Sequence, residues 1–195
     1  FVRLNRNQKL KCTSPAIFKA MEDWVQRYSN IAMSGPNYRF FASQNAAMPP
    51  FSMNTRVYSC NLIRNDTPYR WRGRYNEDTD LSLRMLKDGW CTVQFYAFLQ
   101  NKMDTQQIKG GNTDQFYSKE GTYLKSKMLL DMHPDVTSLV YKFGRPHHHV
   151  DYRPYAKNKL KFKDNINIKE GVNEYGMKKI TVSKQGLGKT ESEHD

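Results

Sequence analysis

The sequence is poor in cysteine and lacks long apolar runs and internal repeats. Its three cysteines are Cys12, Cys60 and Cys91. An odd number of cysteines without CxxC spacing indicates neither a disulfide framework nor a zinc ribbon, and buried thiols are expected instead. No segment approaches the roughly 20 apolar residues of a membrane helix, and no charged-then-apolar leader opens the chain. These absences exclude repeat architectures and favour a soluble, intracellular protein without a membrane partner.

Positive charge is what the sequence has in excess. The 195 residues include 31 Lys and Arg against 19 Asp and Glu, which gives a formal net charge of +12. Such an excess favours a polyanionic partner, because binding to phosphates releases counterions, and nucleic acid is the first candidate. The alternative is a basic surface that is only solvated, since net charge does not report where the charges cluster.

The length and the aromatic content predict one domain. Chains of about 100 to 200 residues usually form a single domain, and an aromatic fraction of 13% supplies apolar surface for a core. We expect this domain over residues 1–185 and a disordered tail over residues 186–195. Because the sequence around Phe1 already reads as the interior of a domain, we expect the chain to be the C-terminal part of a larger one.

Hydrophobic spacing alternates between helical and strand periods, which predicts an α/β fold with a mixed sheet flanked by helices. An irregular loop around Met48–Pro50 is expected between the first two strands. The helices are expected at Pro15–Tyr28, Glu77–Asp88 and Asn112–Asp131, and the strands at Ile31–Phe41, Arg56–Ile63, Cys91–Leu99 and Val136–Phe143.

Three carboxylates, Glu77, Asp78 and Asp80, stand at the start of the second expected helix in the string NEDTD. The helix dipole and the free amides stabilise anions there, so at least one carboxylate is expected to be ionised. A carboxylate within hydrogen-bond reach of a hydroxyl can act as a general base, and the others can orient Arg84 or the acceptor. The alternative is an ordinary acidic first turn with Asn76 as its cap.

Cations and aromatic side chains alternate immediately before this helix, in the string RWRGRY. Such a segment suits phosphate contacts together with stacking on an extruded base, and the basic residues 157–163 are a second candidate. The alternatives are a solvated loop that packs its Trp inward and a charged edge strand that deters aggregation. The candidate DNA-binding residues are Arg70, Trp71, Arg72, Arg74, Lys159 and Lys161.

Two further clusters could bind ligands. The adjacent His147, His148 and His149 could supply a metal ligand, because neutral imidazole binds divalent transition metals. The alternative is a strand in which one of these histidines is buried and two are exposed. A glycine loop can present backbone amides to the phosphate or sugar of a donor, or can be a plain connection. Its residues are Lys109, Gly110, Gly111 and Asn112.

Longer strings resemble known enzymes. NEDTDLSLRMLKDGW resembles the helix of GT-A-fold glycosyltransferases whose initial carboxylate faces the acceptor hydroxyl. Over about residues 55–155, the chain is similar to the TET-associated glycosyltransferase family of phages, which is related to the base J glucosyltransferases. The strings that carry this similarity are RGRYNEDTDLSLRMLKDGWCTVQFYAFLQNK, QQIKGGNTDQFYSKEGTYLKSKMLLDMHPDV and RPHHHVDYRPY.

The resemblance implies a GT-A-like fold that transfers a hexose from a nucleotide sugar, with a UDP-sugar expected, to the hydroxymethyl group of a 5-hydroxymethylpyrimidine in DNA. A phage enzyme of this kind would act in the host cytoplasm. In inverting members the acidic residue of the motif is the general base, which implies Asp78, with Glu77 as runner-up. The resemblance also implies Mn²⁺ or Mg²⁺ on the diphosphate, held with the help of His147 and His148. A fixed base requires the target group to leave the duplex stack.

The sequence lacks a convincing DxD motif after an early strand, where GT-A enzymes usually hold the cation. Asp78-Thr79-Asp80 matches the DxD pattern but occupies the position of the general base. We therefore expect that nucleotide-binding strands are missing here and that an upstream segment or a partner chain completes the donor site. Two other functions stay open, namely a non-catalytic DNA-binding module with a GT-A-like fold and a transferase with a non-DNA acceptor. The donor sugar, the anomeric outcome and the parent base, cytosine or uracil, also stay open.

Overall fold

The computed structural model describes residues 1–43, 47–102, 122–142 and 144–165. Residues 1–163 form one compact unit. The described residues build a mixed α/β fold with three α-helices, as the sequence predicted. The predicted tail, residues 186–195, lies outside the described residues, so the boundary at residue 185 stays a prediction. None of the helices formed by the described residues is long and apolar enough to cross a membrane.

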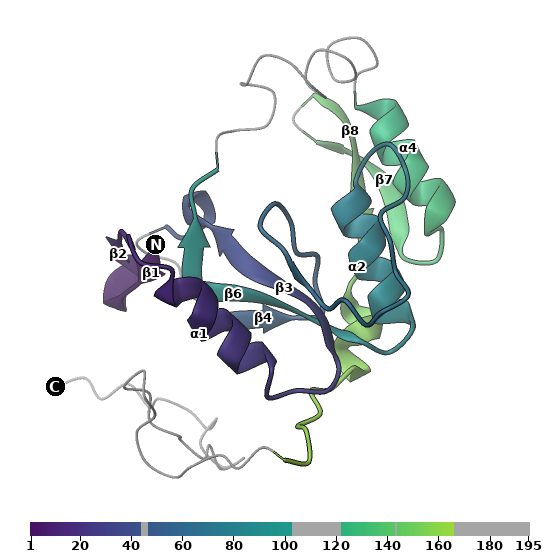
Figure 1. The fold of residues 1–195 in the computed structure, drawn as a ribbon. Helices are drawn as coiled ribbons and strands as arrows, with labels where there is room; N and C mark the ends of the chain where they lie inside the picture. Colours follow the sequence, from purple (N-terminus) through teal and green to yellow (C-terminus); the bar gives the residue numbers. More distant parts are fainter. Residues whose placement is uncertain (44–46, 103–121, 143, 166–195) are drawn as a thin grey trace, which may run out of the picture. The chain divides into compact units, whose positions relative to one another are not determined.

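A mixed sheet forms the centre of this unit (Figure 1). Its two long strands, β3 (Ile31–Tyr38) and β6 (Cys91–Gln100), pair in parallel. All other pairings in this sheet are antiparallel, and the strand order is β2-β1-β6-β3-β5, with β4 also paired to β6. The four short strands are β1 (Val2–Arg3), β2 (Lys9–Leu10), β4 (Phe51–Met53) and β5 (Leu62–Ile63).

Two helices cover opposite faces of this sheet. Helix α1 (Ala16–Val25) packs Met21 against Ile31, whereas α2 (Glu77–Lys87) packs Leu81 and Met85 against Ala32. Ile31 and Ala32 are neighbours in β3, and successive side chains of a strand point to opposite faces. With both faces covered, β3 and the first half of β6 are buried almost throughout, as is typical of parallel strands.

The C-terminal part of this unit packs on α2. It comprises α4 (Tyr123–Met132), the antiparallel pair β7 (Thr137–Lys142) and β8 (Arg145–Val150), and the short 3₁₀ helix η4 (Arg153–Lys157). Its core is a cluster in which Leu83 and Leu86 of α2 meet Leu129, Val136 and Tyr155. This packing fixes β8 and the residues after it relative to the start of α2.

The predicted strand at Arg56–Ile63 is wrong except for its last two residues, which form β5. Ser59 has a φ of 74°, which breaks an extended chain. The amide of Val57 donates to the hydroxyl of Ser82 in α2 instead of to a strand. At Cys60 the carbonyl oxygen approaches Gly35 so closely that a Cβ on this glycine would lie 2.1 Å from it. Only glycine fits there.

Other predicted elements agree with the structure in type and differ mainly in their ends. The expected helices at 15–28 and 77–88 correspond to α1 and α2, and the expected strands at 31–41, 91–99 and 136–143 correspond to β3, β6 and β7. Of the expected helix at 112–131 the structure describes α4, from Tyr123 on, while residues 112–121 lie outside the described residues. Residues 157–163 form no edge strand, only an isolated bridge between Phe162 and Tyr28.

Candidate functional site

The acidic helix start lies on the side of the sheet where ligands of α/β proteins usually bind. Asp88, Gly89 and Trp90 reverse the chain between α2 and β6, with Gly89 at a φ of 86° and its amide bonded to the carbonyl of Leu86. The helix therefore runs back along the sheet, and its N-terminus points toward the carboxyl ends of β3 and β6. In open α/β sheets the crevice at these ends is the common ligand site.

The first turn of α2 leaves one carboxylate oxygen available. Asn76 occupies the N-cap position with a φ of 49°, as the alternative interpretation expected, but its side chain donates to the carbonyl of Lys125 (2.8 Å) instead of accepting a hydrogen bond from the first turn. Asp78 is half-buried, and its Oδ1 accepts the Thr79 amide at 2.7 Å. Its Oδ2 has no hydrogen bond to any described residue. Glu77 is exposed.

Asp80, two residues later, is fully buried and enclosed by three nitrogen-bearing side chains. Arg72 donates to it from Nη2 at 3.0 Å, Arg84 donates from Nε at 3.1 Å, and His133 Nε2 lies 2.9 Å from Oδ1. Burial by itself would raise the pKa of this carboxyl, but these hydrogen bonds and the two guanidinium charges outweigh it and lower the pKa to about 2. Asp80 is therefore a buried, ionised group that joins α2 to the end of α4 and to the loop that contains Arg72. Both of its carboxylate oxygens already accept hydrogen bonds.

Three side chains from other segments are coupled electrostatically near Asp78, and of these Tyr152 is the one that senses the charge of Asp78 itself. The phenol of Tyr152 is held in its protonated form because burial raises its pKa, an effect opposed by the charge of Arg56 and reinforced by that of Asp78. His148 of β8 faces the same guanidinium. Arg56 makes no ion pair with a carboxylate of the described residues, and its Cζ lies 4.8 Å from the centroid of the Tyr58 ring. The site thus combines an ionisable carboxylate, a neutral phenol, an imidazole and a cation.

His148 is uncharged at neutral pH. Burial lowers its pKa to about 4, assisted by the positive charges of Arg56 and Lys125 and by His147. Its Nδ1 is buried and has no hydrogen-bond partner among the described residues. A buried nitrogen without a partner is uncommon in a folded protein, so this atom is a candidate contact for a ligand group.

The pair His147 and His148 does not fit the predicted metal site. Neighbouring residues of a strand point to opposite faces, so these imidazoles diverge. His147 accepts a hydrogen bond from Arg145 Nε at 3.2 Å, and His148 faces the positive charge of Arg56, which disfavours a second cation. In the part of the chain that the structure describes, no three His, Cys, Asp or Glu side chains are grouped to hold a metal.

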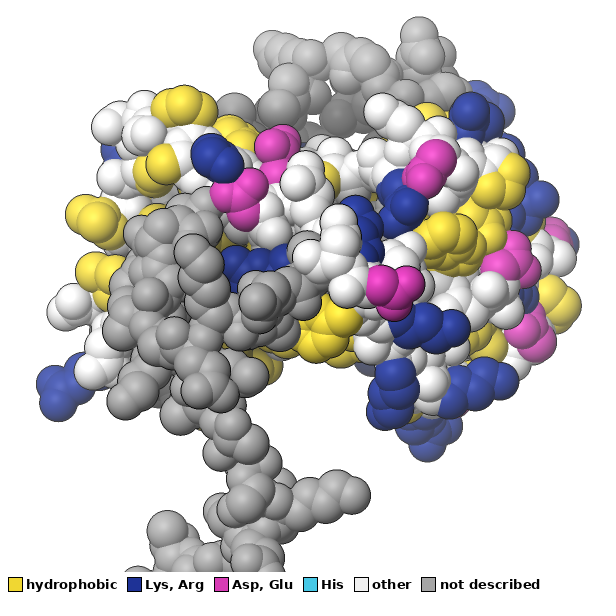
Figure 2. Space-filling model, turned by 60° about the horizontal axis from the view of Figure 1, so that its bottom comes forward, with side chains coloured by type: hydrophobic (Ala, Val, Ile, Leu, Met, Phe, Trp, Pro, Cys, Tyr) yellow, Lys and Arg dark blue, Asp and Glu magenta, His cyan; other side chains and the backbone are white. Residues whose placement is uncertain are grey.

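The predicted DNA-binding residues come from two separate segments, and several of them already have partners within the chain. Arg72 is bound to Asp80, and Arg70 donates to the carbonyls of Thr67 and Tyr69. The Cζ of Arg74 lies 5.7 Å from the centroid of the Tyr75 ring, while Trp71 is 48% exposed. Lys159 and Lys161 lie on a separate segment whose backbone is hydrogen-bonded to Asn30. On the face drawn in Figure 2, basic side chains form groups with acidic ones among them.

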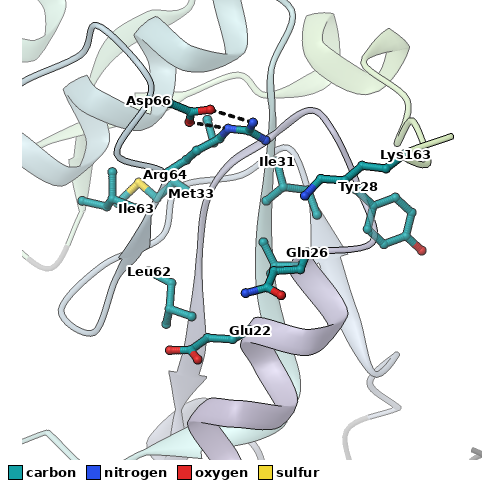
Figure 3. Close-up of a pocket in the computed structure, with 12 residues that line it drawn as sticks. Glu22, Gln26, Tyr28, Ile31, Met33, Leu62, Ile63, Arg64, Asp66 and Lys163 are labelled. Carbon is teal, nitrogen blue, oxygen red and sulfur yellow. Dashed lines mark hydrogen bonds and ion pairs between the residues drawn. The ribbon is translucent and has the colours of Figure 1, made fainter. Parts of the chain in front are cut away.

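Two cavities open elsewhere in the described part of the compact unit, and neither is lined by Asp78. One, of about 330 Å³, lies between the end of α1 and β5, where Arg64 is paired with Asp66 (Figure 3). The other, of about 510 Å³, lies beside the start of α1 and the ends of β3 and β6. The predicted donor loop, Lys109, Gly110, Gly111 and Asn112, lies outside the described residues.

We expect the neutral His148 to make the protein less stable in mild acid. An unfolded histidine has a pKa of about 6.5, whereas that of folded His148 is about 4. The unfolded chain therefore takes up the proton first as the pH falls. The unfolding free energy contributed by this residue is kept above pH 6.5 and decreases by on the order of 2–3 kcal/mol between pH 7 and pH 4.5.

Urea titrations at the two pH values measure this effect. His148→Asn is expected to lose less stability than the parent protein on acidification, by about the stated amount. His149→Asn is the matched control, because the neighbouring His149 side chain is exposed and points to the other face. Equal pH dependence in His148→Asn and the parent protein would show that His148 is not held neutral.

A comparison with known protein families finds one match. Residues 1–111 match a family model described as TET-Associated Glycosyltransferase. No curated protein matches the chain, and no solved structure does either. The GT-A fold therefore stays a prediction. The matched region contains Asp78, Asp80 and Arg56, while His148 and Tyr152 lie beyond it.

Proposed function

The chain belongs to the TET-associated glycosyltransferase family, and on this premise we propose that it transfers a hexose from a UDP-sugar to the hydroxymethyl group of a 5-hydroxymethylpyrimidine in DNA, with Asp78 as general base. The observation that carries this proposal is the difference between two carboxylates in one helical turn. Asp80 is saturated by Arg72, Arg84 and His133, whereas Asp78 keeps Oδ2 without a partner among the described residues.

The reaction is a single displacement. The acceptor oxygen forms a bond to the anomeric carbon while the bond between that carbon and the diphosphate oxygen breaks, and its electron pair leaves with the nucleoside diphosphate. Asp78 takes the proton of the acceptor hydroxyl as the new bond forms, which avoids a free alkoxide. The configuration at the anomeric carbon is inverted, because the acceptor attacks from the side opposite the leaving group.

The neighbours of Asp78 suit the charges that change in this step. Tyr152 stays protonated within the electrostatic range of Asp78, and its hydroxyl has no hydrogen-bond partner among the described residues, so it can donate to the carboxylate or to the acceptor oxygen. Arg56 is a cation without a carboxylate partner in the described chain, and we assign it to the negative charge that develops on the leaving diphosphate. A preorganised cation in a partly buried site stabilises such charge more strongly than water does.

The test is to incubate the chain with DNA that contains 5-hydroxymethylcytosine or 5-hydroxymethyluracil and a panel of UDP-sugars, and to measure the nucleosides by mass spectrometry. We expect a hexose added to one of the two bases. Parallel reactions with Mn²⁺, Mg²⁺ or EDTA test the cation that the sequence implied, and an N-terminally extended chain tests whether a further segment completes the donor site. DNA binding without transfer under all conditions would favour the non-catalytic module, and transfer only to non-DNA acceptors would overturn the DNA assignment.

A further inference from the structure

Two adjacent phenylalanines lie exposed where β3 ends. The 3₁₀ helix η2 (Arg39–Phe41) follows β3 directly, and its tight turn directs Phe40 and Phe41 outward. Phe40 is 82% exposed and Phe41 is 47% exposed, and their ring centroids lie 5.3 Å apart in an edge-on arrangement. Single exposed apolar residues are common on protein surfaces, but a contiguous exposed pair on a fixed turn indicates a contact surface.

A series of ring contacts leads from this pair to Arg56, which is coupled electrostatically to the candidate site. Phe41 stacks on Tyr38 with centroids 5.7 Å apart, and Tyr38 meets Tyr58 edge-on at 4.6 Å. The guanidinium of Arg56 covers Tyr58 at 4.8 Å. The next residue in the series is Tyr152, whose phenol is influenced by both Arg56 and Asp78. The exposed pair and Arg56 therefore belong to one chain of contacting side chains.

The segments that carry the exposed pair, the two tyrosines and Arg56 are free of acidic residues. Residues 24–65 contain Arg27, Arg39, Arg56 and Arg64 but no Asp or Glu, and residues 89–102 contain none either. Arg39 lies 4.6 Å over the ring of Phe1, and Lys102 Nζ lies 5.8 Å from the centroid of Tyr38. Neither cation makes an ion pair within the described chain. Exposed aromatic rings flanked by cations, in sequence segments free of acidic residues, are complementary to a polyanion that carries flat rings.

We propose that Phe40 and Phe41 form a stacking platform for unpaired bases of the DNA next to the target nucleotide, with Arg39 and Lys102 on the neighbouring phosphates. This inference rests on the proposed DNA acceptor. It adds two points, namely the place where the DNA strand binds and the unpaired state of the bases next to the target. Base stacking on aromatic side chains requires bases that have left the duplex, and it tolerates any sequence because every base has a π-face. The platform therefore selects single-stranded or locally opened DNA over an intact duplex.

The test is binding of the full chain to a fluorescein-labelled single-stranded 12-mer, measured by anisotropy without any donor sugar. Phe40→Ala and Phe41→Ala are each expected to weaken binding about ten-fold, since each removes one stacking partner. Phe40→Trp is expected to keep the affinity. Phe162→Ala is the matched control, because Phe162 is 49% exposed and stacks on Tyr28 in the same way as Phe41 on Tyr38. Its affinity is expected to stay within about two-fold of the parent.

Binding of Phe40→Ala and Phe41→Ala as tight as that of the parent protein would overturn the proposal. So would gel filtration that shows the parent protein as an oligomer and the double variant as a monomer at unchanged DNA affinity, because the pair would then join copies of the chain. Loss of binding in these variants while the parent transfers no sugar to DNA would support the platform and reject the acceptor. Transfer of sugar to DNA by the parent protein, with unchanged binding in both variants, would support the DNA acceptor and reject the platform.

Discussion

Asp78→Asn is expected to reduce glycosyl transfer by at least about 100-fold, in line with the 10²–10⁴ range of general base catalysis. The amide has the shape of the carboxylate and can still accept the hydrogen bond from Thr79, but it cannot take the proton of the acceptor. Because the Asp78 side chain is half-buried and bonded only to Thr79 among the described residues, the fold should be retained. The measurement is the initial rate at saturating donor and acceptor, together with DNA affinity, which should not change.

Glu77→Gln is the control for this variant. It removes the same charge one residue earlier in the same helical turn, but Glu77 is exposed. We expect a rate within about three-fold of the parent, because removal of an exposed charge from a helix start changes only a weak, solvent-screened interaction. If Asp78→Asn retains full turnover, the assignment of the base is wrong, and a large loss in Glu77→Gln alone would move the role to the runner-up.

Asp80→Asn is expected to lower the free energy of unfolding by about 3 kcal/mol. Removing one partner of a buried ion pair typically costs 3–5 kcal/mol, because the other charge stays buried without compensation. Here the side chains of Arg84 and Arg72 are 20% and 50% exposed, so water solvates part of their charge, and the lower end of the range applies. The measurement is urea unfolding followed by circular dichroism at pH 7.

The matched control for this variant is Asp66→Asn. Asp66 also binds an arginine through two hydrogen bonds, but its side chain is 64% exposed. Solvent screening makes exposed pairs of this kind weak, so we expect little change in unfolding. The pH dependence gives a second readout, because the pKa of folded Asp80 is about 2, below that of an unfolded Asp. Its stabilisation is present above about pH 4 and is lost as the pH falls toward 2. Asp80→Asn should lack this loss.

The contrast between Asp78 and Asp80 also changes the interpretation of the basic string that precedes them. Arg72 carries one of the charges that the sequence suggested for phosphate contacts, but in the structure its Nε and Nη2 donate to Asp80. Arg72→Ala is therefore expected to act mainly on stability. We therefore propose η2 and the residues around it, and not Arg72, as the contact surface for nucleic acid.

Local patterns were enough to predict much of the fold. The spacing of Leu81, Met85 and Leu86 and the glycine after Asp88 identified α2, and the apolar run from Cys91 identified β6, because helical and strand periods depend on neighbouring residues only. The acidic start of α2 was recognised for the same reason. The strand expected at Arg56 failed because its backbone is shaped by partners far away in the sequence, the hydroxyl of Ser82 and the close approach of Gly35.

The sequence by itself determined the α/β class, the main helices and strands, the family and the turn that carries the candidate base. Only the tertiary structure decided which carboxylate of that turn is free. His133 reaches Asp80 across 53 positions, and Tyr152, whose phenol is influenced by both Arg56 and Asp78, lies far from both in the sequence. Such encounters depend on how α2, α4 and β8 pack. The environment of a carboxylate decides whether it acts as a structural ion or as a base. That environment is a property of the packing and not of the neighbouring residues in the sequence.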